Sequence, residues 1–123
     1  MAAAGKVRPP GCLVFMGSTG ARRPRAGLGI ASTVTVAFPT LIASLALELA
    51  PIRVNLIAAG FVDTPLSASL LGGDLDCDEL RAILPIWRVI GPADVAALAV
   101  HIMSNTALTG ATYDIDGGQQ LIS

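Results

Sequence analysis

The sequence predicts an α/β fold in which helices cover a short parallel sheet. Residues 11–16 and 52–58 are mainly apolar runs. They lack the alternation of polar and apolar residues that is typical of a strand with one solvent-exposed face. Residues 111–116 form a third candidate strand. Segments with helical periodicity separate these runs. An alternation of apolar strands and helices is typical of a parallel sheet with helices on its faces.

A long helix is predicted over residues 30–50. Leucines recur there at a spacing of four residues: Leu41, Leu45 and Leu49. Pro51 ends the helix, because proline cannot continue the backbone hydrogen-bond pattern. Pro39 removes one such bond inside it, so a kink is expected near Thr35.

The remaining segments are connections and two shorter helices. Residues 17–29 are predicted to be a loop rich in Gly, Pro and Arg, and residues 59–69 a turn and loop. An acidic stretch, residues 74–79, is expected to open a short helix that ends at Leu84, with its carboxylates facing the N-terminal dipole. Another helix is predicted over residues 91–103.

Composition limits the class of protein. The 123 residues are 53% hydrophobic and 14% charged, which excludes intrinsic disorder. The formal net charge of −1 gives no electrostatic reason to expect a nucleic-acid or membrane-surface partner. Two cysteines, Cys12 and Cys77, are too few for a disulfide scaffold and lack metal-site spacing, so no metal site is expected. Free thiols are typical of a reducing compartment, and we therefore expect a cytoplasmic location.

One segment is long enough to cross a membrane. Residues 26–47 contain no charged residue. They do contain Gly27, Gly29, Pro39 and several hydroxyl side chains, which favours a helix buried at a protein interface. A parallel sheet of only three strands is also a poor independent domain, because both of its edges are unpaired. Both observations favour a partner, or a further piece of the same fold.

Two motif-bearing stretches resemble the C-terminal half of the short-chain dehydrogenase/reductase family. Residues 44–65, SLALELAPIRVNLIAAGFVDTP, are similar to the end of that family's active-site helix, its sixth strand and the turn that follows. Residues 88–118 are similar to the next helix, a Thr-Gly turn and the last strand, which ends in Asp-Gly-Gly. The resemblance implies a partial Rossmann-like three-layer fold with about three parallel strands over residues 11–123. Residues 1–10 are expected to form an N-terminal tail.

The resemblance also assigns positions to the family's catalytic groups. Ser18 stands at the position of the catalytic serine, whereas Ala31 and Thr35 stand at the positions of the tyrosine and lysine. The chain has one tyrosine, Tyr113, and one lysine, Lys6, so no Tyr-x-x-x-Lys motif exists in it. A methyl and a hydroxyl group cannot replace a phenol activated by an ammonium group, so the family's usual mechanism is absent.

The resemblance implies NAD or NADP as cofactor. It aligns four residues with the turn that holds the nicotinamide carboxamide: Asn55, Gly60, Val62 and Thr64. The usual proline of that turn is Ala59 here. The glycine-rich turn that binds the pyrophosphate belongs to the family's first βα unit, and no such motif follows a strand in this sequence.

Several other residues are interpreted as structural. Asp116 is expected to hold the turn at Gly117 and Gly118. His101, the only histidine, is expected in a core or interface, and Arg22, Arg23 and Arg25 in a solvated loop. Trp87 lies where the family has its substrate loop, and either lines a pocket or packs.

Three hypotheses about function remain. The first is an oxidoreductase of this family for a small-molecule carbonyl or alcohol, whose chain is truncated or whose partner supplies the nucleotide-binding half, and which is inactive alone. A homo-oligomer or such a complementing half is the expected partner. The second is a non-catalytic oligomerisation module built on the uncharged helix. The third is a remnant reading frame that does not fold stably. No nucleic-acid or membrane partner is expected.

Overall fold

The computed structural model describes residues 11–70 and 77–122, with side chains for residues 11–67 and 77–122. The strands are β1 (Cys12–Ser18), β2 (Arg53–Ala59) and β3 (Thr112–Ile115). The helices are α1 (Gly29–Glu48), α2 (Pro65–Leu70), α3 (Cys77–Ile83), α4 (Pro92–Ser104) and α5 (Gln119–Ile122), with a single 3-10 turn, η2 (Gly20–Arg22).

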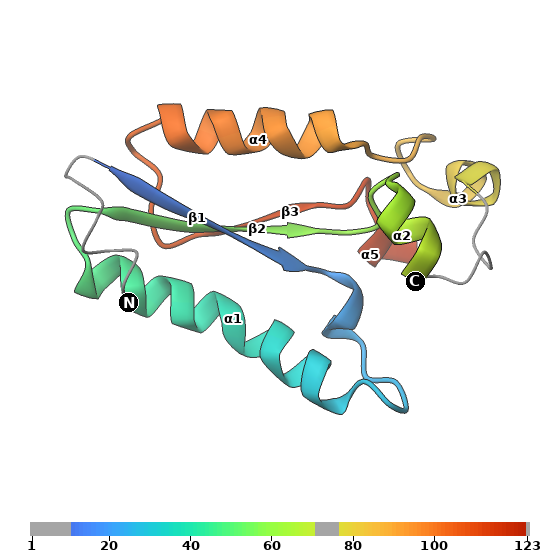
Figure 1. Ribbon diagram of the computed structural model, residues 1–123, viewed down its shortest axis with the longest axis horizontal. Helices are drawn as coiled ribbons and strands as arrows, with labels where there is room; N and C mark the ends of the chain where they lie inside the picture. The colour runs from blue at the N-terminus through green and yellow to red at the C-terminus, as the bar shows by residue number, and fades with distance from the viewer. Residues whose placement is uncertain (1–10, 71–76, 123) are drawn as a thin grey trace.

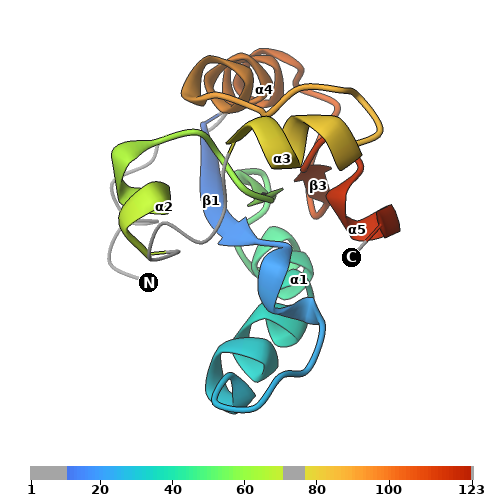
Figure 2. The same ribbon diagram turned by 90° about the vertical axis from the view of Figure 1, so that its right-hand side faces the viewer.

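The elements form three layers, with α1 on one face of the sheet and α4 on the other (Figures 1 and 2). The strands are parallel in the order β1-β2-β3. All residues of the central strand β2 are buried, which explains why its sequence carries almost no polar alternation. The predicted α/β class with a three-stranded parallel sheet is confirmed.

Helix α1 contacts the sheet through its C-terminal half. Ile42 and Leu45 are buried against Val54 and Leu56 of β2. Of the predicted leucine stripe, Leu41 is instead half exposed, because the buried side of the helix is centred one residue later. The helix runs without interruption through Pro39, and it diverges from the sheet toward its N-terminal end (Figure 1).

A buried arginine fastens helix α4. Helix α4 begins where the sequence predicts, with Pro92 in its first turn. There the Asp94 carboxylate accepts a hydrogen bond from the Gly91 N–H at 2.8 Å. At its end, the Arg53 guanidinium of β2 donates to the carbonyls of Ile102 and Met103, each at 2.9 Å. A third bond reaches the carbonyl of Leu108 at 2.9 Å. The first two bonds satisfy carbonyls that a helix C-terminus leaves unpaired, and the third holds the loop after the helix.

Two short helices, α2 and α5, lie in segments for which the sequence did not predict a helix. Helix α2 begins inside the predicted loop of residues 59–69, because the Thr64 hydroxyl accepts a hydrogen bond from the Ser67 N–H at 3.1 Å and so caps it. Helix α5 follows Gly118 at the end of the chain. Of the acidic stretch, residues 74–76 lie outside the described residues, whereas Asp78 and Glu79 lie in the first turn of α3.

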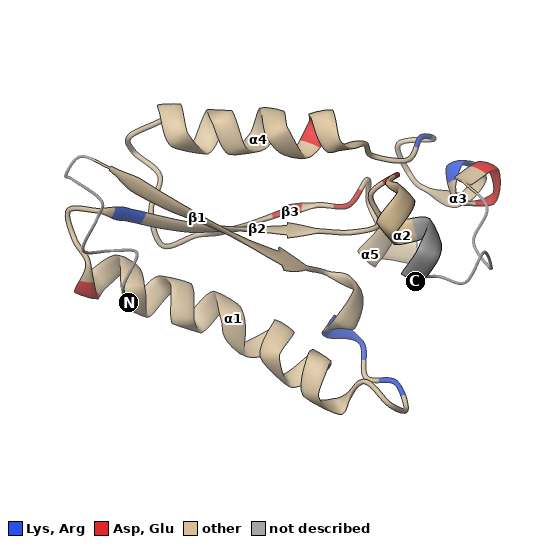
Figure 3. Cartoon of the chain, viewed as in Figure 1, with Lys and Arg blue, Asp and Glu red and all other residues tan. Residues whose placement is uncertain are grey.

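Charged side chains avoid α1 along almost its whole length, with Glu48 at its end as the exception (Figure 3). Helix α1 is long and apolar enough to cross a membrane, judged by length and composition alone. In the fold its C-terminal half packs on one face of the sheet.

Candidate functional site

Ser18, at the C-terminal end of β1, is the predicted catalytic residue. Its Oγ accepts a hydrogen bond from the Gly20 N–H at 3.1 Å, so the hydroxyl shapes the turn into η2. The oxygen keeps a second lone pair and its own proton, because it acts only as an acceptor in this bond. Ser18 can therefore hold the turn and still bind a ligand.

A cavity of about 290 Å³ lies between the end of β1 and helix α1. Ser18 and Thr35 both line it, so the structure brings the predicted serine and lysine positions to one space. Ala31, the predicted tyrosine position, lies one helical turn before Thr35 and is not part of the lining. Most of the wall is apolar and comes from Met16, Val34, Phe38, Pro39, Leu56 and Ala58.

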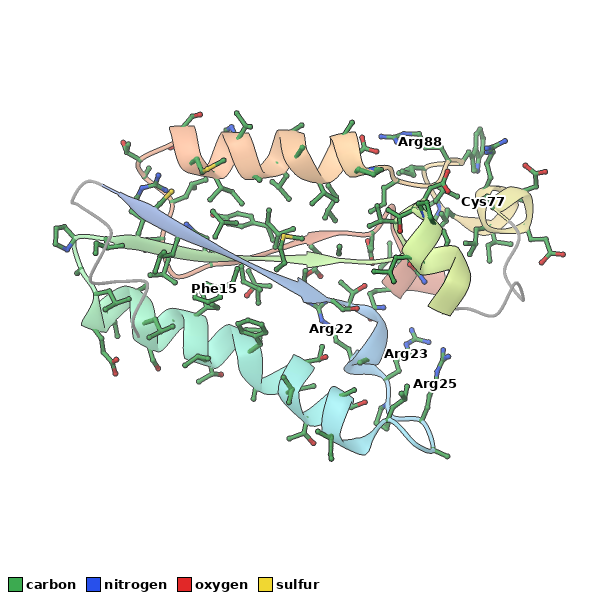
Figure 4. All side chains as sticks on the ribbon, in the orientation of Figure 1. Phe15, Arg22, Arg23, Arg25, Cys77 and Arg88 are labelled. Atoms are coloured by element: carbon green, nitrogen blue, oxygen red, sulfur yellow. The ribbon has the colours of Figure 1, made fainter. Side chains whose placement is uncertain are left out.

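Arg22 also lines this cavity, and its charge is paired across the sheet. Its Nη1 and Nη2 donate to the two carboxylate oxygens of Asp114 on β3, both at 2.6 Å. The hydrogen bond to Asp114 raises the pKa of Arg22, and the same bond holds the pKa of Asp114 below its usual value. The prediction of a solvated loop is therefore wrong for Arg22. Figure 4 shows its side chain near the end of β1.

The loop after β2 carries Gly60, which lies close to the end of the chain. Its N–H donates to the Ile115 carbonyl at 3.0 Å. A Cβ at this position would lie 2.6 Å from the Cβ of Asp116 and 2.7 Å from the Oε1 of Gln119. Glycine is required here because the backbone of the loop touches the turn after β3.

Val62 and Thr64 follow in the same loop. The Thr64 hydroxyl caps α2 and donates to the Ser67 hydroxyl at 2.9 Å. Val62 pairs with Ile90 in a single parallel bridge, in which the Asp63 N–H donates to the Ile90 carbonyl at 2.9 Å. Within the described ranges we find no hydrogen bond to the N–H or C=O of Val62 itself, so these main-chain groups are the ones that a ligand could use.

Asn55 lies away from this loop. It is fully buried near the start of β2, about 16 Å along the strand from Gly60 at the usual rise per residue. Its Nδ2 donates to the Leu108 carbonyl at 2.9 Å, and its Oδ1 accepts from the Ala111 N–H at 3.3 Å. Asn55 thus fastens the segment before β3 and does not share a site with the other three predicted residues.

Residues after β3 hold the two loops that carry the predicted site. Asp116 accepts hydrogen bonds from the N–H groups of Gly118 and Gln120, each at 2.9 Å, and so holds the turn as expected. The Gln119 Oε1 accepts from the Phe61 N–H at 2.9 Å. Arg23 donates to the Gln120 carbonyl at 3.1 Å. Sequence reasoning missed the Gln119 contact, because only the fold brings these loops together.

Two singled-out residues lie elsewhere. His101 is exposed on α4, so it does not lie in the core of this chain, and its expected place at an interface stays a prediction. Trp87 is 79% exposed, with a positive φ of 58°, in the turn after α3. It therefore lines no enclosed pocket in this conformation. The described residues contain no group of three or more His, Cys, Asp or Glu side chains that could hold a metal ion.

Comparison with known proteins settles the family. The sequence model of a family described as enoyl-(acyl carrier protein) reductase matches residues 1–120. The chain belongs to the short-chain dehydrogenase/reductase family. This confirms the resemblance seen in the sequence.

The relatives and structures that the chain resembles are about twice its length. It is 29% identical to the vibriobactin-specific 2,3-dihydro-2,3-dihydroxybenzoate dehydrogenase of Vibrio cholerae, over 94% of this chain and 49% of that protein. It is 33% identical to the 4-formylbenzenesulfonate dehydrogenase of Comamonas testosteroni, over 90% of this chain and 47% of that one. A small-chain dehydrogenase crystallised with NADPH superposes with a TM-score of 0.84 and 26% identity, over 97% of this chain and 55% of that chain.

The residues present fit only a small part of a nicotinamide dinucleotide. The polar side-chain atoms of Asn55 and Thr64 already make internal hydrogen bonds, so of the predicted nicotinamide contacts the main chain of Val62 is left without a partner among the described residues. The described residues supply no glycine-rich strand-to-helix turn for the pyrophosphate. We therefore derive no hydride-transfer step from these residues alone.

Proposed function

We propose that this chain forms the substrate-side half of a cytoplasmic NAD(P)-dependent oxidoreductase for a small carbonyl compound or alcohol. A nucleotide-binding half, on the same polypeptide or on another, would complete it. The cavity beside Ser18 carries the proposal, because it joins the predicted serine and lysine positions in one space of ligand size.

The chain's own residues would bind and orient the substrate. The Ser18 hydroxyl would donate to a substrate oxygen while its lone pair continues to accept from Gly20. Thr35 would hold a water molecule or a hydroxyl group at the opposite wall. Without a phenol and an ammonium group at Ala31 and Thr35, proton transfer would depend on water, so we expect low activity even in a completed protein.

A chimaera tests the proposal. Residues 11–123 would replace the corresponding C-terminal half of the small-chain dehydrogenase that was crystallised with NADPH. We expect NADPH to raise the melting temperature of the chimaera and not that of the 123-residue chain alone, because only binding to the native state stabilises it. A chimaera that unfolds cooperatively but does not respond to NADPH or NADH would overturn the proposal.

Helix α1 favours a second candidate, a homo-oligomerisation module. Ile30 and Leu47 are each 83% exposed, and Val36 is 63% exposed, on a helix without charge before Glu48. Apolar surface of this kind is typical of an interface between copies. A dimer of the chain that is insensitive to nucleotide, and that a Val36→Lys/Leu47→Lys variant converts to monomer, would support this candidate. Leu66→Lys on α2 is the matched control, because Leu66 is also exposed.

A further inference from the structure

The cavity beside Ser18 has a mainly apolar wall with three polar side chains. Its wall is apolar except for Ser18, Thr35 and Arg22, and Arg22 is the ionised side chain among its lining residues. Small-molecule sites commonly combine an apolar wall with a few polar groups that fix the ligand's orientation. At about 290 Å³, the cavity has room for a ring-sized molecule.

Asp114 fixes the Arg22 guanidinium without using all of its donors. A guanidinium group has five N–H donors, and the two bonds to Asp114 use two of them. Among the described residues the remaining three have no hydrogen-bond partner, and Arg22 lines the cavity, so a ligand there could accept from them. An arginine side chain is charged at ordinary pH, and the bonds to Asp114 raise the pKa of Arg22 further.

We propose that this cavity binds a small, mainly apolar carboxylate, with Arg22 as its anion-binding residue. The proposal rests on the proposed function in one respect, since it assigns a substrate class to the same cavity. The ligand carboxylate would accept from the free N–H groups of Arg22, which leaves the Ser18 proton for the reacting oxygen of the substrate. Its apolar part would lie against Val34, Phe38 and Leu56.

The charges around Arg22 favour a carboxylate over a phosphate. Asp114 already balances the guanidinium, and Asp116 also acts on Arg22 through its charge. A dianion would bring more negative charge to this region than a single cation offsets, whereas a planar monoanion matches the guanidinium fork. Because Asp114 competes for Arg22, binding in the millimolar range is expected.

Benzoate is a suitable probe, with benzyl alcohol as its uncharged analogue. Binding to the 123-residue chain would be followed by the amide NMR shifts of residues around Ser18 and Thr35, without nucleotide. We expect benzoate to bind at least tenfold more tightly than benzyl alcohol. Arg22→Met should abolish that difference, and Arg22→Lys should restore part of it. Arg25→Met, which removes the same charge from an exposed position in the same loop, should leave it unchanged.

Asp114→Asn keeps the proposal testable if Arg22→Met fails to fold. This variant retains the cation and removes its competitor, so benzoate should bind more tightly than to the native chain. Equal binding of benzoate and benzyl alcohol, or weaker benzoate binding in Asp114→Asn, would overturn the proposal. Since no nucleotide is present, failure here is distinct from failure of the NADPH experiment on the chimaera.

Discussion

Arg22 and Asp114 lie 92 residues apart in sequence and meet in two hydrogen bonds of 2.6 Å. The pair joins the turn after β1 to β3, and so crosses the end of the central strand. Asp114 stands opposite Ala58 of β2, and Ala58 is one of the residues that line the cavity. The ion pair therefore lies at the rim of the candidate site.

This pair predicts a pH-dependent contribution to stability. The pKa of Asp114 is lowered in the folded chain by its bonds to Arg22, so folding favours the ionised carboxylate. The contribution should be complete at neutral pH and should disappear as the pH falls below the ordinary value of 3.8. Both side chains are partly exposed, so we expect about 1 kcal/mol or less. Urea unfolding of the native chain and Asp114→Asn from pH 7 to pH 3 measures it. A stability difference that grows toward acid would contradict this assignment.

Replacing Arg53 should lower the free energy of unfolding by more than replacing Asp114. Arg53 is buried and donates to three carbonyls at the end of α4 and in the loop after it. Arg53→Met would leave these carbonyls without their donor, at a cost of about 2–4 kcal/mol in the free energy of unfolding. Arg81→Met is the matched control, because Arg81 is exposed and its pair with Asp78 lies on the surface. Similar losses in the two variants would show that the buried bonds contribute nothing special.

A side chain at position 60 is expected to clash with the turn after β3. A Cβ there would lie 2.6 Å from the Cβ of Asp116, a distance that real Cβ atoms do not adopt. Gly60→Ala should therefore destabilise the chain by about 1–3 kcal/mol and loosen the loop that carries Val62. Gly29→Ala, at a position with nothing within 4 Å, should be neutral or stabilising because it lies at the start of a helix. Thermal unfolding of both variants decides the point, and a neutral Gly60→Ala would refute the close approach.

Local patterns in the sequence predict the sheet and its helices, but not the contacts at the site. The apolar run of β2 and the start of α4 at Pro92 follow from residue order alone, since each depends on neighbours within a few positions. The Arg22–Asp114 pair and the Gln119–Phe61 bond depend instead on segments far apart in the chain. Helix α2 was missed because a capping threonine in a short polar segment is equally typical of a loop.

Restoring a tyrosine at position 31 and a lysine at position 35 is expected to raise reductase activity in a completed protein. Thr35 lines the cavity, and Ala31 lies one turn before it on the same side of α1. Introducing Ala31→Tyr and Thr35→Lys together into the chimaera with a nucleotide-binding half would supply a phenol and an ammonium group beside Ser18. We expect the rate of NADPH-dependent reduction of a small aldehyde to rise by about 10²–10⁴, the usual contribution of a positioned proton donor. The matched control is Ala31→Phe with Thr35→Lys, which has the same bulk and charge but no hydroxyl. A rate for the phenylalanine variant equal to that of the tyrosine variant would show that the cavity does not place this helix position at the reacting oxygen.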